Sequence, residues 1–511
     1  MPNNIMNILP LTKSAEAIIK LYIINVLKMQ FLAKFLSSVI VFLYCSLPLL
    51  SQSISPFSFG LNECKSPVER YRVLLRTHQE ALDKNIQVDY TGISELHIEI
   101  PVDAIPIPLG QNTDFNGLNL YVTNTHKNLF LFTLEQRVQP IDITKDEFVS
   151  GRYLHRPEFS RGYSLLVIED QTLWVNNRKG YDYGATRKDL ILIDHGVAVN
   201  TPVTSYETKV SNPKFYFCKT TGEEKVFKNL HFFRSKDSSF KTFLLKISNG
   251  NSVTIRNVDI YTPISNMFGD GAITIHNSAN ILLDNVNIKG TYSQKRLYGY
   301  GVSFNNVWNS KVFRMEAAAN WGIFGNYNVN KVYLKDCSVN RFDIHCYGRD
   351  VHFDNCQFSE MYNQYSSVYG TIYHKKCTFD QSIPCLIETS FNAYTPFDLV
   401  FEQCTFKLSS EKNSVVSIMG LSDEKNSRPE LAKKCFPNVV MNRCNIEFSG
   451  KVKDWHIFKT NKKLSKPIGY CSDIRVHRLN IRGEKPRFST FNLDVPIENK
   501  LNCRFTKWKS K

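Results

Sequence analysis

A short phrase recurs along the chain between about residues 226 and 479, and it constrains the fold more than any other feature. Each phrase begins with an apolar residue, continues with mixed residues that often end in Asn or Asp, and closes with a small apolar residue. The well-formed phrases are Val253–Val258, Ile281–Val286, Val332–Cys337, Val351–Cys356, Ile372–Cys377, Leu399–Cys404 and Val439–Cys444, while Val226–Leu230, Val312–Ala317 and Ile474–Leu479 fit more loosely. Recurrence every roughly twenty to forty residues is typical of a solenoid whose coils stack on one shared core. Because each phrase alternates as a strand does, we predict an all-β, right-handed parallel β-helix.

The thirteen cysteines support this interpretation. Residues at equivalent positions of stacked coils lie about 4.8 Å apart, so the cysteines that close phrases should form an inward column. A disulfide framework is the alternative, and an exported protein would allow it. Stacked parallel positions, however, rarely offer the side-chain dihedral angle that a disulfide needs. We therefore expect buried, reduced thiols that act as small apolar side chains, and no Cys-x-x-Cys pair suggests a metal site.

Composition and charge indicate a large folded core and an anionic partner. Of the 511 residues, 42% are hydrophobic and 13% aromatic, which excludes a disordered chain. The formal net charge of +16 suggests an acidic polysaccharide, a nucleic acid or an anionic membrane face, with a merely basic surface as the equal alternative. The chain contains no run of five or more Lys or Arg and no zinc-finger or RNA-binding signature. We therefore expect an anionic polysaccharide as partner, and no nucleic acid.

Residues 1–53 have the pattern of a signal peptide. Lys34 precedes an apolar stretch over residues 35–50, and small polar residues follow it. Met29 is the better start, which would make residues 1–28 an upstream extension. The apolar stretch contains a proline and is only about sixteen residues long, short for a membrane span. We expect a secreted, periplasmic or cell-surface protein without a stable membrane span.

Residues 54–212 are predicted to form a capping helix followed by irregular first β-coils. Ser66, Pro67 and Glu69 form a capping box with proline at the first helical position. Residues 62–84 are predicted to form an amphipathic helix, because their apolar residues recur at helical spacing and form a stripe of Val68, Tyr71, Leu74, Leu75 and Leu82. Such a helix can cover the open end of a solenoid.

Between Val88 and about Asn212 the chain alternates as strands do, but without the clean repeat. We favour irregular coils continuous with the solenoid, and a small separate β-domain is the alternative. The regular β-helix is predicted over residues 213–485, and residues 486–511 are predicted to be a basic C-terminal tail.

The candidates for catalysis lie on strands between the phrases. Arg341, Asp343 and His345 form the densest polar cluster, and strand alternation places them on one outward face, about 7 Å between neighbours. A His near a carboxylate can serve as a general base, and an Arg can neutralise a carboxylate or a developing oxyanion. His276 is predicted on the equivalent strand a few coils away. We predict these four as catalytic residues, with a solvated surface ladder as the structural alternative.

Residues in neighbouring strand ends and loops are predicted to bind substrate. Near the catalytic candidates these are Asp270, Arg296, Glu316 and Trp321, and Trp321 could instead be a core residue. Earlier in the chain, a glycine-punctuated loop over residues 176–188 carries Arg178 and Lys179 together with two tyrosines. Cations beside aromatic rings suit an anionic sugar chain, and a solvated loop is the alternative.

The repeat, the export signal, and the stretches Trp321–Gly325 and Arg341–His345 resemble right-handed parallel β-helix proteins of the pectate-lyase superfamily. They are also similar to exported β-helix proteins of gut Bacteroidetes. The resemblance covers most of residues 60–480. It implies a β-helix that acts on uronic-acid glycans, since members are mostly polysaccharide lyases and glycoside hydrolases, with some binding proteins.

No characterised family's catalytic residues carry over to this chain. Pieces similar to polygalacturonase motifs occur in the wrong order, and the aspartate cluster with a following arginine that holds calcium in pectate lyases is missing. We therefore predict no cofactor, and calcium stays open as an alternative that the sequence does not support.

Two hypotheses from different classes follow. The first is an exported enzyme that cleaves an acidic polysaccharide. As a lyase it would use His345 or His276 as base with Arg341, and as a hydrolase it would pair Asp343 with a second carboxylate such as Glu316 or Asp270. The second is a non-catalytic glycan-binding or adhesin-type surface β-helix. Because the outward residues differ from coil to coil, the sequence favours the enzyme.

Overall fold

The structure is a computed structural model, and the fold is described for a defined set of residues. These are 53–110, 112–144, 153–175, 185–202, 213–262, 271–290, 300–317, 322–346, 348–360, 362–366, 368–381, 384–388, 397–409, 414–419, 437–449, 454–460, 473–482, 487–488, 491–492, 502–506 and 509–510. The predicted signal peptide, up to residue 52, lies outside them. Among the described residues, no helix is long and apolar enough to cross a membrane.

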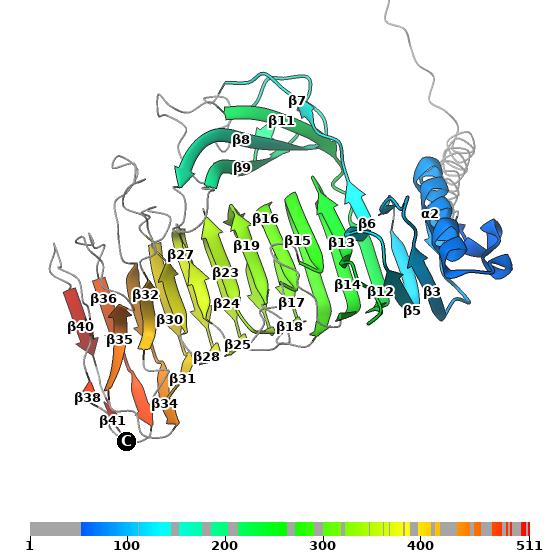
Figure 1. The fold of residues 1–511 in the computed structure, drawn as a ribbon. Helices are drawn as coiled ribbons and strands as arrows, with labels where there is room; N and C mark the ends of the chain where they lie inside the picture. Colours follow the sequence, from blue (N-terminus) through cyan, green and yellow to red (C-terminus); the bar gives the residue numbers. More distant parts are fainter. Residues whose placement is uncertain are drawn as a thin grey trace, which may run out of the picture. The chain divides into compact units, whose positions relative to one another are not determined.

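The described chain is a parallel β-helix, which confirms the predicted fold (Figure 1). The first part contains β1 (Ser53–Ile54), η1 (Pro56–Phe59), η2 (Leu61–Glu63), α2 (Pro67–Lys84), β2 (Gln87–Asp89), β3 (Glu95–Ile100), β4 (Ile107–Pro108), β5 (Thr113–Asn124) and β6 (Leu129–Glu135). The middle part contains β12 (Lys225–Arg234), β13 (Thr242–Ser248), β14 (Asn251–Thr262), β15 (Ile273–Gly290), β16 (Val302–Trp308), β17 (Lys311–Phe313), β18 (Glu316–Ala317), β19 (Ile323–Tyr327), β20 (Val329–Asn330), β21 (Tyr333–Lys335), β22 (Ser338–Val339), β23 (Phe342–Cys346), β24 (Arg349–Asp354), β25 (Gln357–Glu360) and β26 (Asn363–Tyr365). The last part contains β27 (Tyr369–Lys375), β28 (Thr378–Gln381), β29 (Cys385–Glu388), β30 (Phe397–Glu402), β31 (Thr405–Ser409), β32 (Ser414–Met419), β33 (Asn438–Asn442), β34 (Asn445–Ser449), β35 (Asp454–Thr460), β36 (Asp473–His477), β37 (Asn480–Arg482), β38 (Arg487–Phe488), β39 (Phe491–Asn492), β40 (Asn502–Thr506) and β41 (Lys509–Ser510).

The residue before the closing position of each phrase, often Asn or Asp, makes a sharp turn between two strand directions. Asn257 and Asn285 have left-handed backbones, with φ of 53° and 54°. Asn and Asp tolerate this conformation better than other non-glycine residues, which explains the repeat. Arg314 has the same left-handed conformation, with φ of 52°, and so occupies the turn position that precedes the closing residue of its coil. Met315 is therefore equivalent to the closing residues of the other phrases, and the loosely predicted end at Ala317 is wrong.

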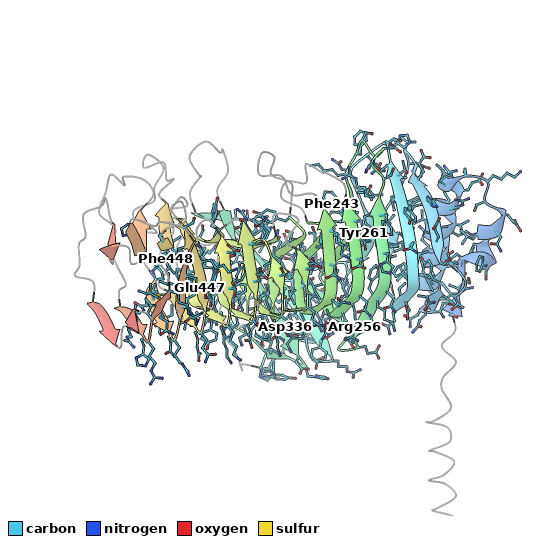
Figure 2. The ribbon with its side chains drawn as sticks, turned by 90° about the horizontal axis from the view of Figure 1, so that it is seen from below. Phe243, Arg256, Tyr261, Asp336, Glu447 and Phe448 are labelled. Carbon is cyan, nitrogen blue, oxygen red and sulfur yellow. The ribbon has the colours of Figure 1, made fainter. Side chains whose placement is uncertain are left out.

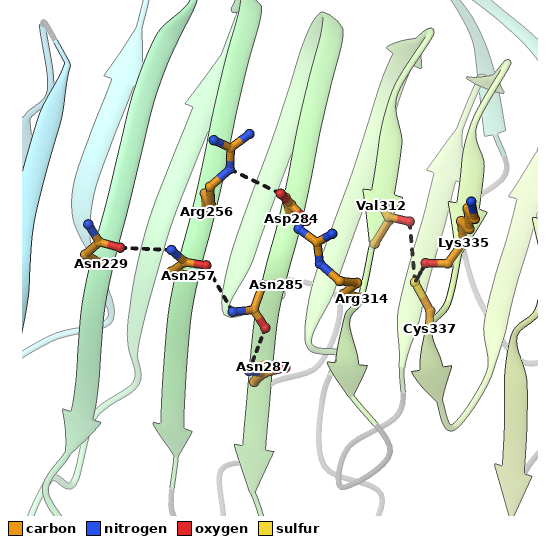
Figure 3. Close-up of polar contacts among 10 residues, drawn as sticks. All are labelled: Asn229, Arg256, Asn257, Asp284, Asn285, Asn287, Val312, Arg314, Lys335 and Cys337. Carbon is orange, nitrogen blue, oxygen red and sulfur yellow. Dashed lines mark hydrogen bonds and ion pairs between the residues drawn. The ribbon is translucent and has the colours of Figure 1, made fainter.

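Side chains at the turns form ladders from coil to coil (Figure 3). Asn257 Nδ2 donates to Asn229 Oδ1 at 3.0 Å, and Asn285 Nδ2 donates to Asn257 Oδ1 at 3.0 Å. Beside this ladder, the carboxylate of Asp284 accepts hydrogen bonds from Arg256 and Arg314 of the adjacent coils. These contacts hold neighbouring coils in one register.

The core consists of inward columns in which equivalent residues of successive coils stack. One column runs through Val312, Leu334, Phe353, His374 and Phe401, all with no exposed surface. A second contains the cysteines that close the phrases, and Cys337, Cys356, Cys377, Cys404 and Cys444 are buried and not in disulfides. The predicted column of reduced, buried thiols is therefore present.

Helix α2 covers the N-terminal end of the solenoid. Ser66 Oγ accepts from Glu69 N at 3.2 Å, and Glu69 in turn accepts from the Ser66 backbone, so the predicted capping box is present. Tyr71 and Leu74 of the predicted stripe are buried. Leu82 is instead 45% exposed, and Thr77, His78 and Ala81 complete the buried face.

Residues 139–220 depart from the expected irregular first coils. While β2 to β6 pair in parallel with the solenoid, β7 (Gln139–Pro140), β8 (Tyr163–Val175), β9 (Ala185–Asp194), β10 (Val197–Ala198) and β11 (Pro213–Thr220) form a separate antiparallel sheet. One face of this inserted sheet packs against Ala279 and Trp308 of the solenoid. Its other face has its own small core. This segment follows the alternative of a small separate β-unit.

The segment predicted as a basic tail continues the solenoid. Strand β40 pairs in parallel with β36, from Asp473↔Asn502 to His477↔Thr506, and β41 pairs with β37. Backbone pairing with the preceding coil therefore extends to Ser510.

Candidate functional site

The Arg341 to His345 region lies on one outward sheet face. Along this face β15, β16, β19, β23 and β26 are neighbours, and Ser303, Phe324, Asp343 and Gln364 occupy equivalent positions. Phe342 and Ile344 point into the core with no exposed surface, as alternation predicted. Arg341 immediately precedes β23, and its side chain lies on the same side as Asp343, because the two form an ion pair.

Five residues form what we call the Arg341–Asp343 cluster: Tyr300, Phe324, Arg341, Asp343 and Tyr362. The Tyr300 hydroxyl donates to the Asp343 carboxylate and accepts from Arg341 Nη2 at 2.7 Å. The guanidinium carbon of Arg341 lies 5.5 Å from the ring centroid of Tyr300 and 5.3 Å from that of Tyr362. The Tyr300 ring stacks on Phe324 at 4.5 Å. The cation is thus held by one carboxylate, one hydroxyl and two aromatic rings.

Gly322 explains how the cluster forms next to strand β19. Its φ of 94° lies in the left-handed region that favours glycine, and a Cβ there would overlap the backbone of Arg341. The glycine in the Trp321–Gly325 stretch therefore allows the chain before β23 to pack closely against the preceding coil.

The cluster is buried except for Tyr362, which is partly exposed, and its charged groups are strongly coupled electrostatically. Asp343 is 0% exposed and Arg341 4% exposed. Burial, together with the Asp343 carboxylate, raises the pKa of Tyr300 well above its usual value. Although burial disfavours the charge of Arg341, Asp343 and Tyr300 raise the pKa of the guanidinium above its usual value. Tyr300 therefore stays a hydrogen-bond donor and Arg341 stays a cation, and the predicted alternative of a solvated surface ladder does not describe this pair.

The two predicted histidines differ in position. His345 lies on β23, two residues after Asp343, and its side chain is outside the described set. His276 lies on β15, which reaches β23 only through β16 and β19, so the two strands are about 14 Å apart. Burial, with Lys188 and Lys246 nearby, lowers the pKa of His276 to about 4. His276 is therefore neutral at pH 7, and it is not within reach of a proton transferred at Asp343.

The inserted sheet brings Lys188, the last residue of the predicted 176–188 loop, against the solenoid, which the sequence did not indicate. Lys188 on β9 lies 3.5 Å from Glu169 on β8 and 5.8 Å from the ring centroid of Tyr327 on β19. Asn306 Nδ2 on β16 donates to the backbone oxygen of Asp189 at 3.1 Å. The sheet thus overlies the strands around His276. No sequence signal relates residues so far apart, because the contact arises only when the insertion folds back.

The predicted substrate-binding residues are only partly tested. Glu316 is exposed on β18, where it pairs with Asn287 and Ser338 in a column on another strand of each coil. The structure therefore does not bring Glu316 to Asp343. Asp270, Arg296, Trp321, Arg178 and Lys179 lie outside the described residues.

Within the described ranges, no group of three or more His, Cys, Asp or Glu residues is positioned to hold a metal ion.

Two solved phage tailspikes share the fold. The tailspike gp61 of Pseudomonas phage phi297 aligns with a TM-score of 0.53 and 10% identity, over 88% of this chain and 84% of its own. The tailspike gp49 of Pseudomonas phage LKA1 aligns with a TM-score of 0.52 and 12% identity, over 86% of this chain and 79% of its own. At such identities the likeness shows the β-helix fold alone. No protein-family model and no curated protein matches the chain.

Proposed function

We propose that the chain is an exported β-helix protein that binds an acidic polysaccharide and cleaves it on the face that carries Arg341, Asp343 and His345. The observation that carries the proposal is the buried Arg341–Asp343 cluster. Taking an ion pair out of water costs free energy that apolar side chains on the same strand would avoid. Such strongly perturbed groups concentrate at functional sites. The net charge of +16 and the resemblance to uronate-active β-helices support an acidic glycan.

Hydrolysis by Asp343 does not fit the burial of its carboxylate, so we propose lyase chemistry for this face. Hydrolysis needs two carboxyl groups that reach the glycosidic bond, about 5 to 10 Å apart. Asp343 is 0% exposed and already accepts from Tyr300 and Arg341, and Glu316 lies on another column. A lyase needs a base and a cation that neutralises the uronate carboxylate. In this proposal His345 is the base, and Asp343 positions Arg341. Because Arg341 is 4% exposed, its cation acts on the uronate through its charge and not through a direct contact.

The burial of the same cluster favours a second candidate, a non-catalytic glycan-binding β-helix. In that case the ion pair would only fix the coil geometry, and the glycan would contact exposed side chains elsewhere.

The test starts with protein beginning near Ser53 and a panel of uronic-acid and neutral polysaccharides. Ultraviolet absorbance of unsaturated products and new reducing ends are followed together. Both signals rising supports the lyase, and reducing ends alone would overturn lyase chemistry in favour of hydrolysis. Binding without either signal would replace the enzyme by the binding candidate.

A double variant, Asp343→Asn with His345→Gln, then locates the chemistry. Turnover should fall by about a hundredfold or more while glycan binding persists, because the loss concerns proton transfer rather than affinity. The matched control is His126→Gln, which changes an exposed histidine in a loop before β6. Thermal unfolding of both variants must be measured, since Asp343 is buried. A folded double variant with unchanged turnover would refute the assignment to this face.

A further inference from the structure

A second outward surface carries aromatic rings and cations in adjacent columns. Along β17, β21, β24 and β27, one column contains Lys311, Tyr333, His352 and Tyr373. The next column contains Phe313, Lys335, Asp354 and Lys375. The residues between them, such as Leu334 and His374, point into the core, so both columns face outward. We call Lys311, Phe313, Tyr333, Lys335, Tyr373 and Lys375 the tyrosine–lysine stripe.

Within the described part of the chain, no ion pair joins the lysines of the stripe to a carboxylate, although Asp354 lies between Lys335 and Lys375 in the strand register. Some cations elsewhere on the solenoid do pair across coils, as Lys407 does with Asp380 at 3.4 Å and Lys228 with Asp114 at 3.0 Å. In the stripe, the tyrosine hydroxyls donate hydrogen bonds to the nearby carboxylates instead. Tyr333 Oη donates to Asp354 Oδ2 at 3.3 Å. Tyr373 likewise donates to Glu402, which also pairs with Arg443.

The rings of the stripe are tilted against one another and are not stacked in parallel. Phe313 and Tyr333 meet at 83° with centroids 5.9 Å apart, and His352 and Tyr373 meet at 52° and 5.6 Å. A different outward column shows the opposite arrangement. There Tyr121, Phe233 and Tyr261 stack at 4.6 and 4.5 Å within 13° of parallel, so each ring covers the next (Tyr261 is labelled in Figure 2). Both sets of rings are partly exposed. Parallel stacking covers both faces of Phe233, whereas a tilted pair leaves a ring face available to a ligand.

We propose that the tyrosine–lysine stripe is a binding track for a polysaccharide that carries carboxylate groups, running along the solenoid axis. Lys311, Lys335 and Lys375 would pair with the carboxylates of the sugars. The tilted rings of Phe313, Tyr333 and Tyr373 would pack against the apolar C–H faces of the sugar rings. The proposal is independent of cleavage, because the stripe and the Arg341–Asp343 cluster lie on different strands of each coil.

Equilibrium binding of the full chain to polygalacturonate, with neutral dextran for comparison, tests the track. The Lys335→Ala/Lys375→Ala variant should bind polygalacturonate about tenfold more weakly and with a smaller salt dependence. The Tyr333→Ala/Tyr373→Ala variant should lose a similar factor without losing the salt dependence. Lys407→Ala and Tyr261→Ala are the matched controls, since one lysine is ion-paired and the other ring is stacked.

The outcomes separate this track from the proposed cleavage. Binding is measured in the Asp343→Asn/His345→Gln background, in which the substrate is not consumed. Weaker binding in the stripe variants supports the track even if the protein cleaves no glycan. Equal binding by stripe and control variants, or no binding of polygalacturonate by the parent, overturns it whatever the result for cleavage.

Discussion

His374 provides a quantitative test of the core, because it is a titratable ring within an apolar column. The ring is 0% exposed and lies between Phe353 and Phe401, with centroids 4.7 and 5.0 Å away. Its Nε2 is 2.9 Å from the Tyr365 hydroxyl. Burial lowers the pKa of His374 to about 3, so the folded protein holds this ring neutral.

The direction of the pH effect follows from the lowered pKa. In the unfolded chain the same histidine has a pKa of about 6.5 and takes up a proton below that pH. The unfolded state therefore binds more protons between about pH 6.5 and 3, and stability falls as the pH is lowered through this window. Lowering the pH from 7.5 to 5 takes the protein about 1.5 pH units below the unfolded pKa of this histidine. His374 alone should then reduce the free energy of unfolding by about 2 kcal/mol.

The assay compares the parent with His374→Phe/Tyr365→Phe, which removes both polar partners and keeps aromatic volume. Denaturant unfolding at pH 7.5 and pH 5 should show that the double variant loses about 2 kcal/mol less than the parent over this interval. His78 and His276, which are also held neutral by burial, leave a residual slope in both proteins. His126→Gln, at an exposed site, should behave as the parent does. Equal losses in the parent and the double variant would refute the reasoning.

Two further predictions concern the turns and the thiols. Lys376 has φ of 54° at a turn position where Asn257, Asn285 and Asn355 stand in other coils. Lys376→Asn should therefore raise the unfolding free energy by about 0.5 kcal/mol in a denaturant titration, whereas Lys407→Asn in an extended strand should not. Burial raises the pKa of Cys377 and Cys404 well above the usual thiol value, so both should resist alkylation at pH 8 until the chain is unfolded. Peptide mapping by mass spectrometry would check this, and rapid labelling of either cysteine in the native protein would contradict the buried column.

The sequence predicts the solenoid because its constraints are local. A turn residue must adopt a left-handed backbone and the next residue must point inward, so Asn257–Val258 and Asp336–Cys337 reveal the coil directly. Where the turn residue is Arg314, the pattern is blurred, and the closing residue was placed at Ala317 instead of Met315. The capping box at Ser66 is likewise a local signal, since its partners are three residues apart.

The candidate site was only partly predictable. Alternation placed Arg341 and Asp343 on one face, and their ion pair follows from that spacing. Their burial depends on Tyr300, which precedes another strand and reaches Asp343 across Phe324. The polar residues of a strand look the same in the sequence whether water or a tyrosine covers them.

The sequence alone therefore determined which residues face inward and how the coils repeat, because strand alternation and turn conformation are set by neighbouring residues. Only the tertiary structure decided that residues 139–220 form a separate sheet over His276 and that the last residues add another coil. It also decided that, among the described residues, no ion pair joins Lys335 or Lys375 to a carboxylate. Such features depend on which distant segments meet, and burial and charge pairing act through space rather than along the chain.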